Sequence, residues 1–293
     1  MPPSPERLPA AQCPSRLRTA RGTVLVRIAT GLVLAPAAIW AILWAPKWVM
    51  LAILVIAAGR CADELVRMFA VVRQRDRFLI AAQAAAIACS PLFGWQAFAL
   101  VLTLSTAFWL GACLVEPGDL AKAAERAALG ALGMVYLGAL VAMLVATFAI
   151  DQKLPTSAFD LGRSGLLGCL AMVFAGDTGA FFAGKAFGRH KLYQLVSPKK
   201  TVEGGIGGLL ASMGAGALWV MLLRPDASLA QGVALGAACG AFGQVGDFAE
   251  SLFKRATDTK DSGALLPGHG GLFDRVDGVL FAAPIVYAWL TLS

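Results

Sequence analysis

The sequence predicts an all-α protein that crosses a membrane about nine times. Of its 293 residues, 58% are hydrophobic and only 15% are charged, and the mean hydropathy is +0.71. Soluble globular domains carry roughly 25% charged residues, so a chain this apolar is not suited to water on all sides. Several apolar runs also reach the roughly 20 residues that a helix needs to cross the bilayer core.

Nine such runs are predicted as spanning helices, in chain order. The second is interrupted near its end by Arg60, Asp63 and Glu64, and the third is short. The nine ranges are Val24–Ala45, Trp48–Val66, Phe78–Phe93, Trp95–Val115, Ala127–Ile150, Gly165–Ala183, Gly204–Leu223, Leu229–Phe248 and Val276–Leu292.

The domain organisation that follows has two parts. Residues 1–22 are rich in proline and arginine, and we predict a disordered basic tail there. We expect residues 23–293 to form a single transmembrane domain that carries the functional site. The apolar run Val24–Ala45 is longer than the roughly 7–15 residues of a signal-peptide core, so we expect it to stay as the first spanning helix.

The distribution of lysine and arginine predicts the orientation. With the amino terminus in the cytoplasm, only four of the 25 basic residues fall on the outer side: Lys47, Lys153, Arg163 and Arg224. Because cytoplasmic loops carry the excess of basic residues, the carboxyl terminus should lie outside and loops 177–205 and 247–278 should face the cytoplasm. We therefore expect a bacterial-type inner membrane protein. The basic residues form no continuous tract, so no nucleic acid partner is expected.

Three aspartates are the predicted metal ligands. Asp247 lies near the end of the eighth run, where a carboxylate is costly unless it is paired or faces a polar cavity. Asp274 and Asp277 open the ninth run and should share one helix face. Hard oxygen ligands without a cysteine or histidine cluster favour Mg²⁺, as one ion or two.

The polar stripe on the eighth run has a simpler reading as well. If the helix continues past the run, Asp247, Glu250, Ser251 and Lys254 share one face. Glu250 and Lys254 could then form an ordinary i,i+4 ion pair. For Asp274 and Asp277 the simpler reading is capping of a helix amino terminus, which would account for one of them.

The loop that begins at Asp177 is a predicted phosphate site. Its six basic or imidazole side chains are Lys185, Arg189, His190, Lys191, Lys199 and Lys200, and Ser197 and Thr201 add hydroxyl donors. The Walker pattern GxxxxGK[ST] is absent. Attraction to anionic lipid headgroups is the alternative, because lysines and arginines beside a spanning helix suffice for it.

Together these motifs resemble the phosphatidate cytidylyltransferases, also called CDP-diacylglycerol synthases. The family signature S-x-x-K-R-x4-K-D-x-G-x2-L-P-x-H-G-G-x-x-D-R-x-D is met without a gap from Ser251 to Asp277. The segments that begin DTGAF at Asp177 and SPKKT at Ser197 are also similar to the family. Two departures are Val202 and Phe181, where the family often has an aromatic residue and a tyrosine.

The resemblance implies transfer of a cytidylyl group from CTP to phosphatidic acid, with a divalent metal, by a homodimer among membrane lipids. It assigns Asp247, Asp274 and Asp277 to metal and, with Lys254, to catalysis. His269 could coordinate metal, donate to phosphate or fix the loop. The predicted substrate-binding residues are Asp177, Lys185, Arg189, Ser197, Lys199, Lys200, Thr201, Glu203, Arg255, Lys260, Asp261, His269 and Arg275.

Two other functions fit the sequence less well than this prediction. A CDP-alcohol phosphotransferase would need its DGxxAR signature, but Asp277–Gly278 continues as VLFAA. An ion-coupled transporter would use Asp247 as an ion site, yet the charges concentrate in the loops and not near the membrane midplane.

Overall fold

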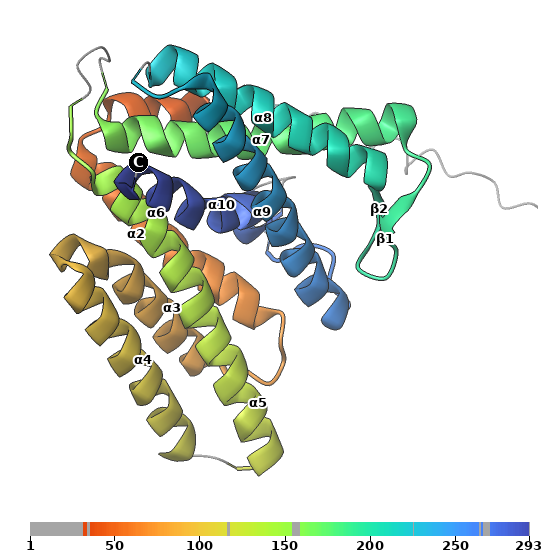
Figure 1. The fold of residues 1–293 in the computed structure, drawn as a ribbon. Coiled ribbons are helices and arrows are strands. Elements are labelled where there is room, and N and C mark those ends of the chain that lie inside the picture. The colour runs from red at the N-terminus through yellow and green to blue at the C-terminus, as the bar shows by residue number, and fades with distance from the viewer. Residues whose placement is uncertain are drawn as a thin grey trace, which may run out of the picture.

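The computed structural model describes residues 32–33, 36–115, 118–153, 159–224, 226–263, 265 and 270–292. Residues 36–44 are helical, and nine further helices follow (Figure 1). These are α2 (Lys47–Arg67), α3 (Gln74–Cys89), α4 (Trp95–Val115), α5 (Leu120–Ala131), α6 (Gly138–Ala149), α7 (Leu161–Phe187), α8 (Val202–Leu223), α9 (Leu229–Ala256) and α10 (Phe273–Leu292).

Three shorter elements complete the described chain. A 3₁₀ turn, η1 (Ser90–Phe93), continues α3, and a π-helical segment, η2 (Leu132–Leu137), joins α5 to α6. Strands β1 (Lys191–Tyr193) and β2 (Ser197–Thr201) form an antiparallel hairpin between α7 and α8. This hairpin projects from the end of the α7–α8 pair in Figure 1.

The prediction of an all-α membrane protein is confirmed in its main point. Six helical segments of the described residues are long and apolar enough to cross a membrane, and the remaining predicted runs Trp48–Val66 and Leu229–Phe248 are helical too. The six are Gln74–Phe93, Trp95–Val115, Leu120–Ala149, Leu161–Phe187, Val202–Leu223 and Phe273–Leu292. Of the predicted run Val24–Ala45, residues 32–33 and 36–44 are helical, while 24–31, 34–35 and the predicted tail 1–22 lie outside the described residues.

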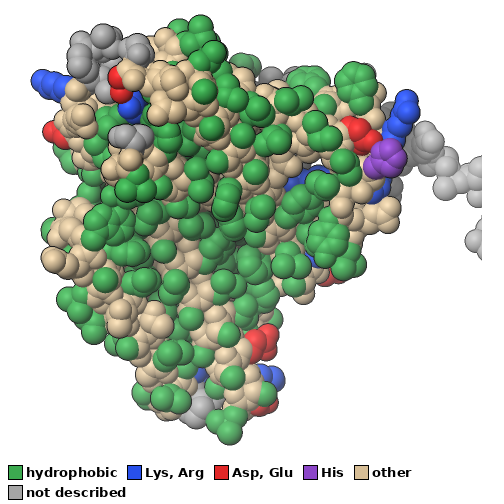
Figure 2. All heavy atoms as spheres, viewed as in Figure 1, with side chains coloured by type: hydrophobic (Ala, Val, Ile, Leu, Met, Phe, Trp, Pro, Cys, Tyr) green, Lys and Arg blue, Asp and Glu red, His purple; other side chains and the backbone are tan. Residues whose placement is uncertain are grey.

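The surface of these helices suits lipid. Only 11% of the apolar window in α4 is buried, and Leu100, Leu104 and Phe108 on it are each more than half exposed. Hydrophobic side chains cover most of the face seen in Figure 2, with charged ones at its edges. An apolar area this continuous marks contact with a nonpolar environment.

Local sequence fixes where the site-bearing helices begin. Asp160 caps α7 by accepting from the Arg163 amide at 2.9 Å, and Thr201 caps α8 by accepting from the Gly204 amide at 3.1 Å. Ser228 and Gln231 form a capping box at the start of α9. Each cap satisfies amide groups that the helix itself leaves unpaired.

Small residues let α7 and α8 approach closely. A Cβ on Gly208 would lie 2.9 Å from the Gly176 carbonyl oxygen, and one on Gly204 would lie 2.9 Å from the Ala180 carbonyl oxygen. Glycine at these positions therefore permits the close packing that small residues allow between membrane helices. The five described cysteines carry free thiols.

Asp160 also joins the starts of two distant helices. It lies 3.5 Å from Lys47 Nζ at the start of α2 and 3.3 Å from Arg163 Nε in α7. The starts of α2 and α7 therefore meet at one end of the bundle, and the candidate site residues Glu64 and Lys185 come from the last turns of the same two helices.

Candidate active site

The polar stripe predicted on the eighth run is present, because α9 stays helical to Ala256. The ion pair expected at i,i+4 forms: Lys254 Nζ lies 2.7 Å from Glu250 Oε2. The same Lys254 nitrogen lies 3.0 Å from Asp274 Oδ1 on α10. Lys254 therefore ties the end of α9 to the start of α10.

Three carboxylates lie together where α9 meets α10. Asp247, Glu250 and Asp277, here called the acidic group, each offer an oxygen within 4.8 Å of the other two. Among the described residues, no group donates a hydrogen bond to the buried Glu250 Oε1. Clustered carboxylates with a free oxygen are the ligand chemistry that suits Mg²⁺, so the acidic group fits such an ion.

A glycine on α9 makes this meeting possible. A Cβ on Gly246 would lie 2.5 Å from the Asp277 carbonyl oxygen and 2.9 Å from the Phe281 ring. Any side chain at this position would push α10 away from α9. Gly246 therefore lets the first turns of α10 reach Asp247 on the neighbouring helix.

Asp274 lies in the first turn of α10, as predicted, but it is not one of the three carboxylates of the acidic group. Its Oδ2 accepts hydrogen bonds from the Ser262 amide at 2.9 Å and the Gly271 amide at 2.8 Å, while its Oδ1 faces Lys254. Asp274 therefore binds the loop to the start of α10. Glu250, which was not a predicted ligand, is the third member of the acidic group.

Glu64 on α2 holds the same loop from the opposite side. Its side chain is buried, and its Oε2 accepts from the Phe273 amide at 2.9 Å and from Ser262 Oγ at 3.4 Å. A Cβ on Gly271 would lie 2.5 Å from that oxygen. The loop is thus fixed between Glu64 and Asp274, with glycine where a side chain has no room.

A cavity of about 430 Å³ opens beside Asp247. Its basic residues are Lys185, Lys199 and Lys200, and Asp177 and Asp247 are its carboxylates. Its full lining is Asp177, Ala180, Phe181, Gly184, Lys185, Leu192, Lys199, Lys200, Thr201, Gly204, Gly205, Gln244 and Asp247. Asp247 belongs to both the cavity and the acidic group, so the predicted phosphate and metal regions are contiguous.

The hairpin supplies the positive side of this cavity. Lys200 on β2 forms an ion pair with Asp247 and stands 4.1 Å from the centroid of the Phe248 ring. Tyr193 on β1 packs against the same ring at 6.3 Å. Arg255 Nε donates to the Val196 carbonyl oxygen at 3.2 Å, which fastens the hairpin turn to α9.

The remaining predicted residues are spread around this core. Glu203 accepts from the amides of Arg189 and His190 at 3.0 and 3.2 Å, so it orders the turn before β1. Lys260 and Asp261 are exposed in the loop after α9, and Ser197 begins β2. Arg275 lies in the first turn of α10, directly after Asp274. His269 lies outside the described residues.

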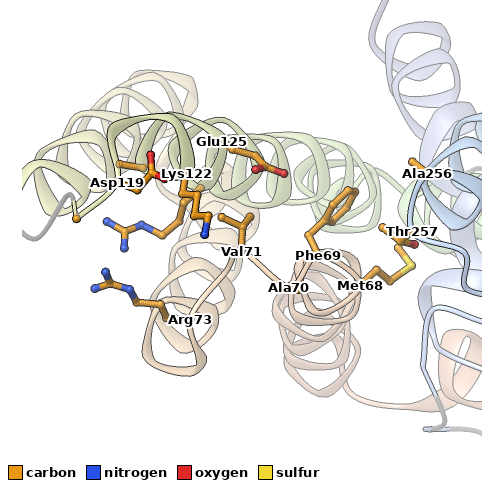
Figure 3. Close-up of a pocket in the computed structure, with 13 residues that line it drawn as sticks. Met68, Phe69, Ala70, Val71, Arg73, Asp119, Lys122, Glu125, Ala256 and Thr257 are labelled. Atoms are coloured by element: carbon orange, nitrogen blue, oxygen red, sulfur yellow. The ribbon is translucent and has the colours of Figure 1, made fainter.

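A second, larger cavity of about 670 Å³ is built from other parts of the chain. Figure 3 shows side chains from the turn after α2, the start of α5 and the end of α9, among them Phe69, Lys122 and Thr257. Its lining includes none of the predicted site residues. Volume alone would therefore select the wrong cavity, and the convergence of carboxylates and lysines decides in favour of the smaller one.

Two of these positions were missed as site residues. Glu250 follows Asp247 by three residues, so helical periodicity places both on the same face of α9. The prediction for Glu250, however, was an ion pair with Lys254 and not a place beside the aspartates. Gln244, three residues before Asp247, lines the cavity and donates to the Gly205 carbonyl oxygen at 3.0 Å. Nothing in the sequence indicates the contact of Glu64 with Phe273, 209 residues away.

Comparison with known proteins agrees with these motifs. Residues 25–293 match the sequence model of the cytidylyltransferase family. The chain is 33% identical over 161 residues to the phosphatidate cytidylyltransferase of Bacillus subtilis (strain 168) and 43% identical over 123 residues to that of Staphylococcus aureus (strain COL). These stretches are 55% and 41% of this chain.

The matches cover 57% of the Bacillus protein and 46% of the Staphylococcus protein. The chain thus spans about half the length of the curated relatives it matches. The family match, by contrast, extends over nearly all of the described structure, including α9, the hairpin and α10. This chain belongs to the cytidylyltransferase family.

Proposed function

We propose that the protein transfers a cytidylyl group from CTP to phosphatidic acid, giving CDP-diacylglycerol and pyrophosphate. One observation carries the proposal: the cavity with Lys185, Lys199 and Lys200 is continuous, through Asp247, with the acidic group. Such a site accepts a polyphosphate together with a divalent cation. The names of the bacterial relatives supply the nucleotide and the lipid.

The reaction needs charge control more than proton removal. A phosphate monoester has a second pKa near 6, so at neutral pH the lipid phosphate is mostly a dianion and needs no general base. Its oxygen attacks the α-phosphorus of CTP, the bond from that phosphorus to the bridging oxygen breaks, and pyrophosphate leaves with the electron pair. The main difficulty is to bring two polyanions together.

The residues of this site suit that demand. Lys199 and Lys200 on β2, with Lys185, would neutralise the phosphates, and Lys254 would keep Glu250 and Asp274 in place. Asp247, Glu250 and Asp277 would hold Mg²⁺, which when bound polarises phosphoryl oxygens and neutralises charge. The proposal also includes Asp274 as a metal ligand and the binding of one ion or two.

The placement in the membrane is proposed on the charge distribution. We infer nine spanning helices, with the amino terminus and the site in the cytoplasm and the carboxyl terminus outside the inner membrane. The contacts of Lys47 and Arg163 with Asp160 support this orientation, because these two basic residues lie together and both are predicted on the outer side. The acyl chains would stay in the bilayer, and two copies would form a homodimer.

A direct assay tests the reaction. Purified protein is incubated with CTP labelled at the α-phosphate, phosphatidic acid and Mg²⁺, and we expect label in the organic extract as a CDP-lipid, with equimolar pyrophosphate. Boiled protein and label at the γ-phosphate are the controls, because neither should yield labelled lipid. Extracts from active preparations with no more label than the boiled control would rule the proposal out.

A further inference from the structure

The long helix from Leu120 to Ala149 is interrupted by the π-helical segment η2, and this segment carries Tyr136. A π-helical turn holds one extra residue, so it changes which side chains face a neighbouring helix, and such turns are frequent at functional sites. Gly138 follows directly, where a Cβ would lie 3.0 Å from the Ala84 carbonyl oxygen. The segment is therefore held firmly against α3.

The ring of Tyr136 lies against the helices that carry the acidic group. Its centroid is 6.2 Å from that of Phe273 and 5.9 Å from that of Phe281, both on α10. Phe273, Asp277 and Phe281 are four residues apart, so Asp277 is on the same face of α10, between the two phenylalanines.

The contact of Tyr136 with α9 places its ring at the same end of the acidic group. The Tyr136 ring is 6.3 Å from that of Phe253, which is three residues after Glu250 on α9. Asp277 and Glu250 are also the two carboxylates that act most strongly on the Tyr136 phenol. Both helices thus place the tyrosine beside two members of the acidic group.

The hydroxyl of Tyr136 is what a packing role leaves unexplained. Its oxygen is fully buried, and no described residue forms a hydrogen bond with it. The same is true of Glu250 Oε1 among the described residues. A buried hydroxyl without a partner is costly, and phenylalanine would fill the same space among three phenylalanine rings without that cost.

We propose that Tyr136 is a fourth member of the site and that its hydroxyl donates a hydrogen bond to an oxygen of the ligand held by the acidic group. That oxygen belongs either to a phosphate of the nucleotide or to a water on the divalent cation. The inference rests on the proposed function for the identity of the ligand, but not for the position of the hydroxyl.

Tyr136→Phe tests this with the loss of a single oxygen atom. The unfolding temperature without ligand should equal or exceed that of the unchanged protein, because a buried polar group without a partner has been removed. Turnover of CTP should fall by about 10- to 100-fold, as expected for a lost hydrogen bond to a charged acceptor. Stabilisation combined with lower activity is a pattern that a packing residue would not give.

Tyr287→Phe is the matched control on α10. The Tyr287 hydroxyl has a partner, since it accepts a hydrogen bond from Trp95 Nε1 at 3.1 Å. We expect this variant to lower the unfolding temperature and to leave turnover unchanged. Only Tyr287→Phe should therefore lower the unfolding temperature, and only Tyr136→Phe should lower turnover.

Binding measurements on the same purified variants separate the two sources of the oxygen. Weaker binding of Mg²⁺ alone by Tyr136→Phe assigns it to water on the cation, and weaker binding of Mg²⁺–CTP with unchanged Mg²⁺ affinity assigns it to the phosphate. If the unchanged protein makes no CDP-lipid but either binding change is seen, the role of Tyr136 stands without the proposed reaction. Unchanged turnover and binding in Tyr136→Phe, or no Mg²⁺ binding by the unchanged protein, would overturn it.

Discussion

Carboxylates occur in two opposite settings in this protein. Asp63 on α2 has three arginines around it, with Arg77 at 2.7 Å, Arg67 at 3.2 Å and Arg60 at 3.5 Å. In the acidic group three carboxylates share a small space, and Glu250 Oε1 has no partner among the described residues. In the first arrangement three cations surround one carboxylate, and in the second three carboxylates face two lysines, Lys200 and Lys254.

The comparison shows how a structural charge differs from a functional one. A buried ion pair with its partners in place maintains packing and offers nothing to a ligand. Carboxylates held together repel one another, and either protonation or a bound cation relieves that repulsion, while other parts of the fold maintain their position. In this chain the parts that hold the acidic group in position are Lys254, Gly246 and the loop fixed by Glu64.

The largest effect should come from Asp277→Asn. The change keeps the shape of the side chain but removes one negative charge from the acidic group, so turnover should fall by about 100-fold or more. Stability without Mg²⁺ should not fall, because repulsion with Asp247 is reduced. Steady-state rates and unfolding temperatures with and without Mg²⁺ measure both effects, and near-normal turnover would exclude Asp277 from the site.

Asp63→Asn is the matched change in the other setting. It leaves three arginines without their shared carboxylate, and breaking a buried pair of this kind costs about 3–5 kcal/mol of unfolding free energy. Turnover per folded molecule should remain near that of the unchanged protein. If Asp63→Asn abolished turnover without loss of stability, the distinction between the two settings would be wrong.

A smaller effect is expected from Glu64→Ala, which links the two regions. Removing this carboxylate leaves the Phe273 amide without its acceptor, at a cost of about 1–3 kcal/mol, and loosens the loop that leads into α10. Turnover should fall by about tenfold or more because Asp277 is displaced. Glu64→Gln, which keeps an acceptor oxygen, should recover much of this loss.

Hydrogen exchange of segment 262–273 measures the loop directly, without reference to activity. We expect faster exchange in Glu64→Ala than in Glu64→Gln, since only the latter can still accept from Phe273. Equal exchange in both variants and the unchanged protein would mean that Glu64 does not hold the loop.

The sequence predicted the helices better than it predicted the contacts between them. Trp48–Val66 agrees with α2 to one residue at each end, because its limits are set by a proline and a charged turn. The helix predicted from Ala127 begins at Leu120, seven residues earlier, since Lys122, Glu125 and Arg126 hid the amphipathic first turns. An apolar run thus gives a spanning core but not the polar turns beyond it.

The site was predictable where its residues are neighbours in sequence. Asp247 was predicted from the cost of a carboxylate near the end of an apolar run, and Asp277 from the DRVD unit that opens the ninth run. Tyr136 and Glu64 were not, because each meets α10 across more than a hundred residues, and no local pattern encodes that contact. The π-helical turn that presents Tyr136 has no sequence signal of its own in the apolar run LGMVYL.

The smallest effect should come from Asp226→Asn. This variant tests whether a carboxylate is functional because of its location in the chain or because of the groups around it. Asp226 lies between α8 and α9, in the half that carries the site, yet its carboxylate is paired with Arg224 at 2.7 Å. Hydrogen bonding to Arg224 lowers the pKa of Asp226 from its ordinary value. A lowered folded-state pKa means that the pair stabilises the protein above the ordinary value of about 3.9 and that this contribution is lost as the pH falls below it.

Because Asp226 is about half exposed, the variant should lower the unfolding free energy by less than about 1 kcal/mol. The difference from the unchanged protein should be constant between about pH 5 and 8 and shrink as the pH falls below about 4, with turnover at pH 7 unaffected. Unfolding followed against pH measures it. If Asp226→Asn affects stability alone, a place in the site-bearing half does not make a carboxylate functional, and the grouping of Asp247, Glu250 and Asp277 is what differs. Loss of turnover in Asp226→Asn would contradict that conclusion.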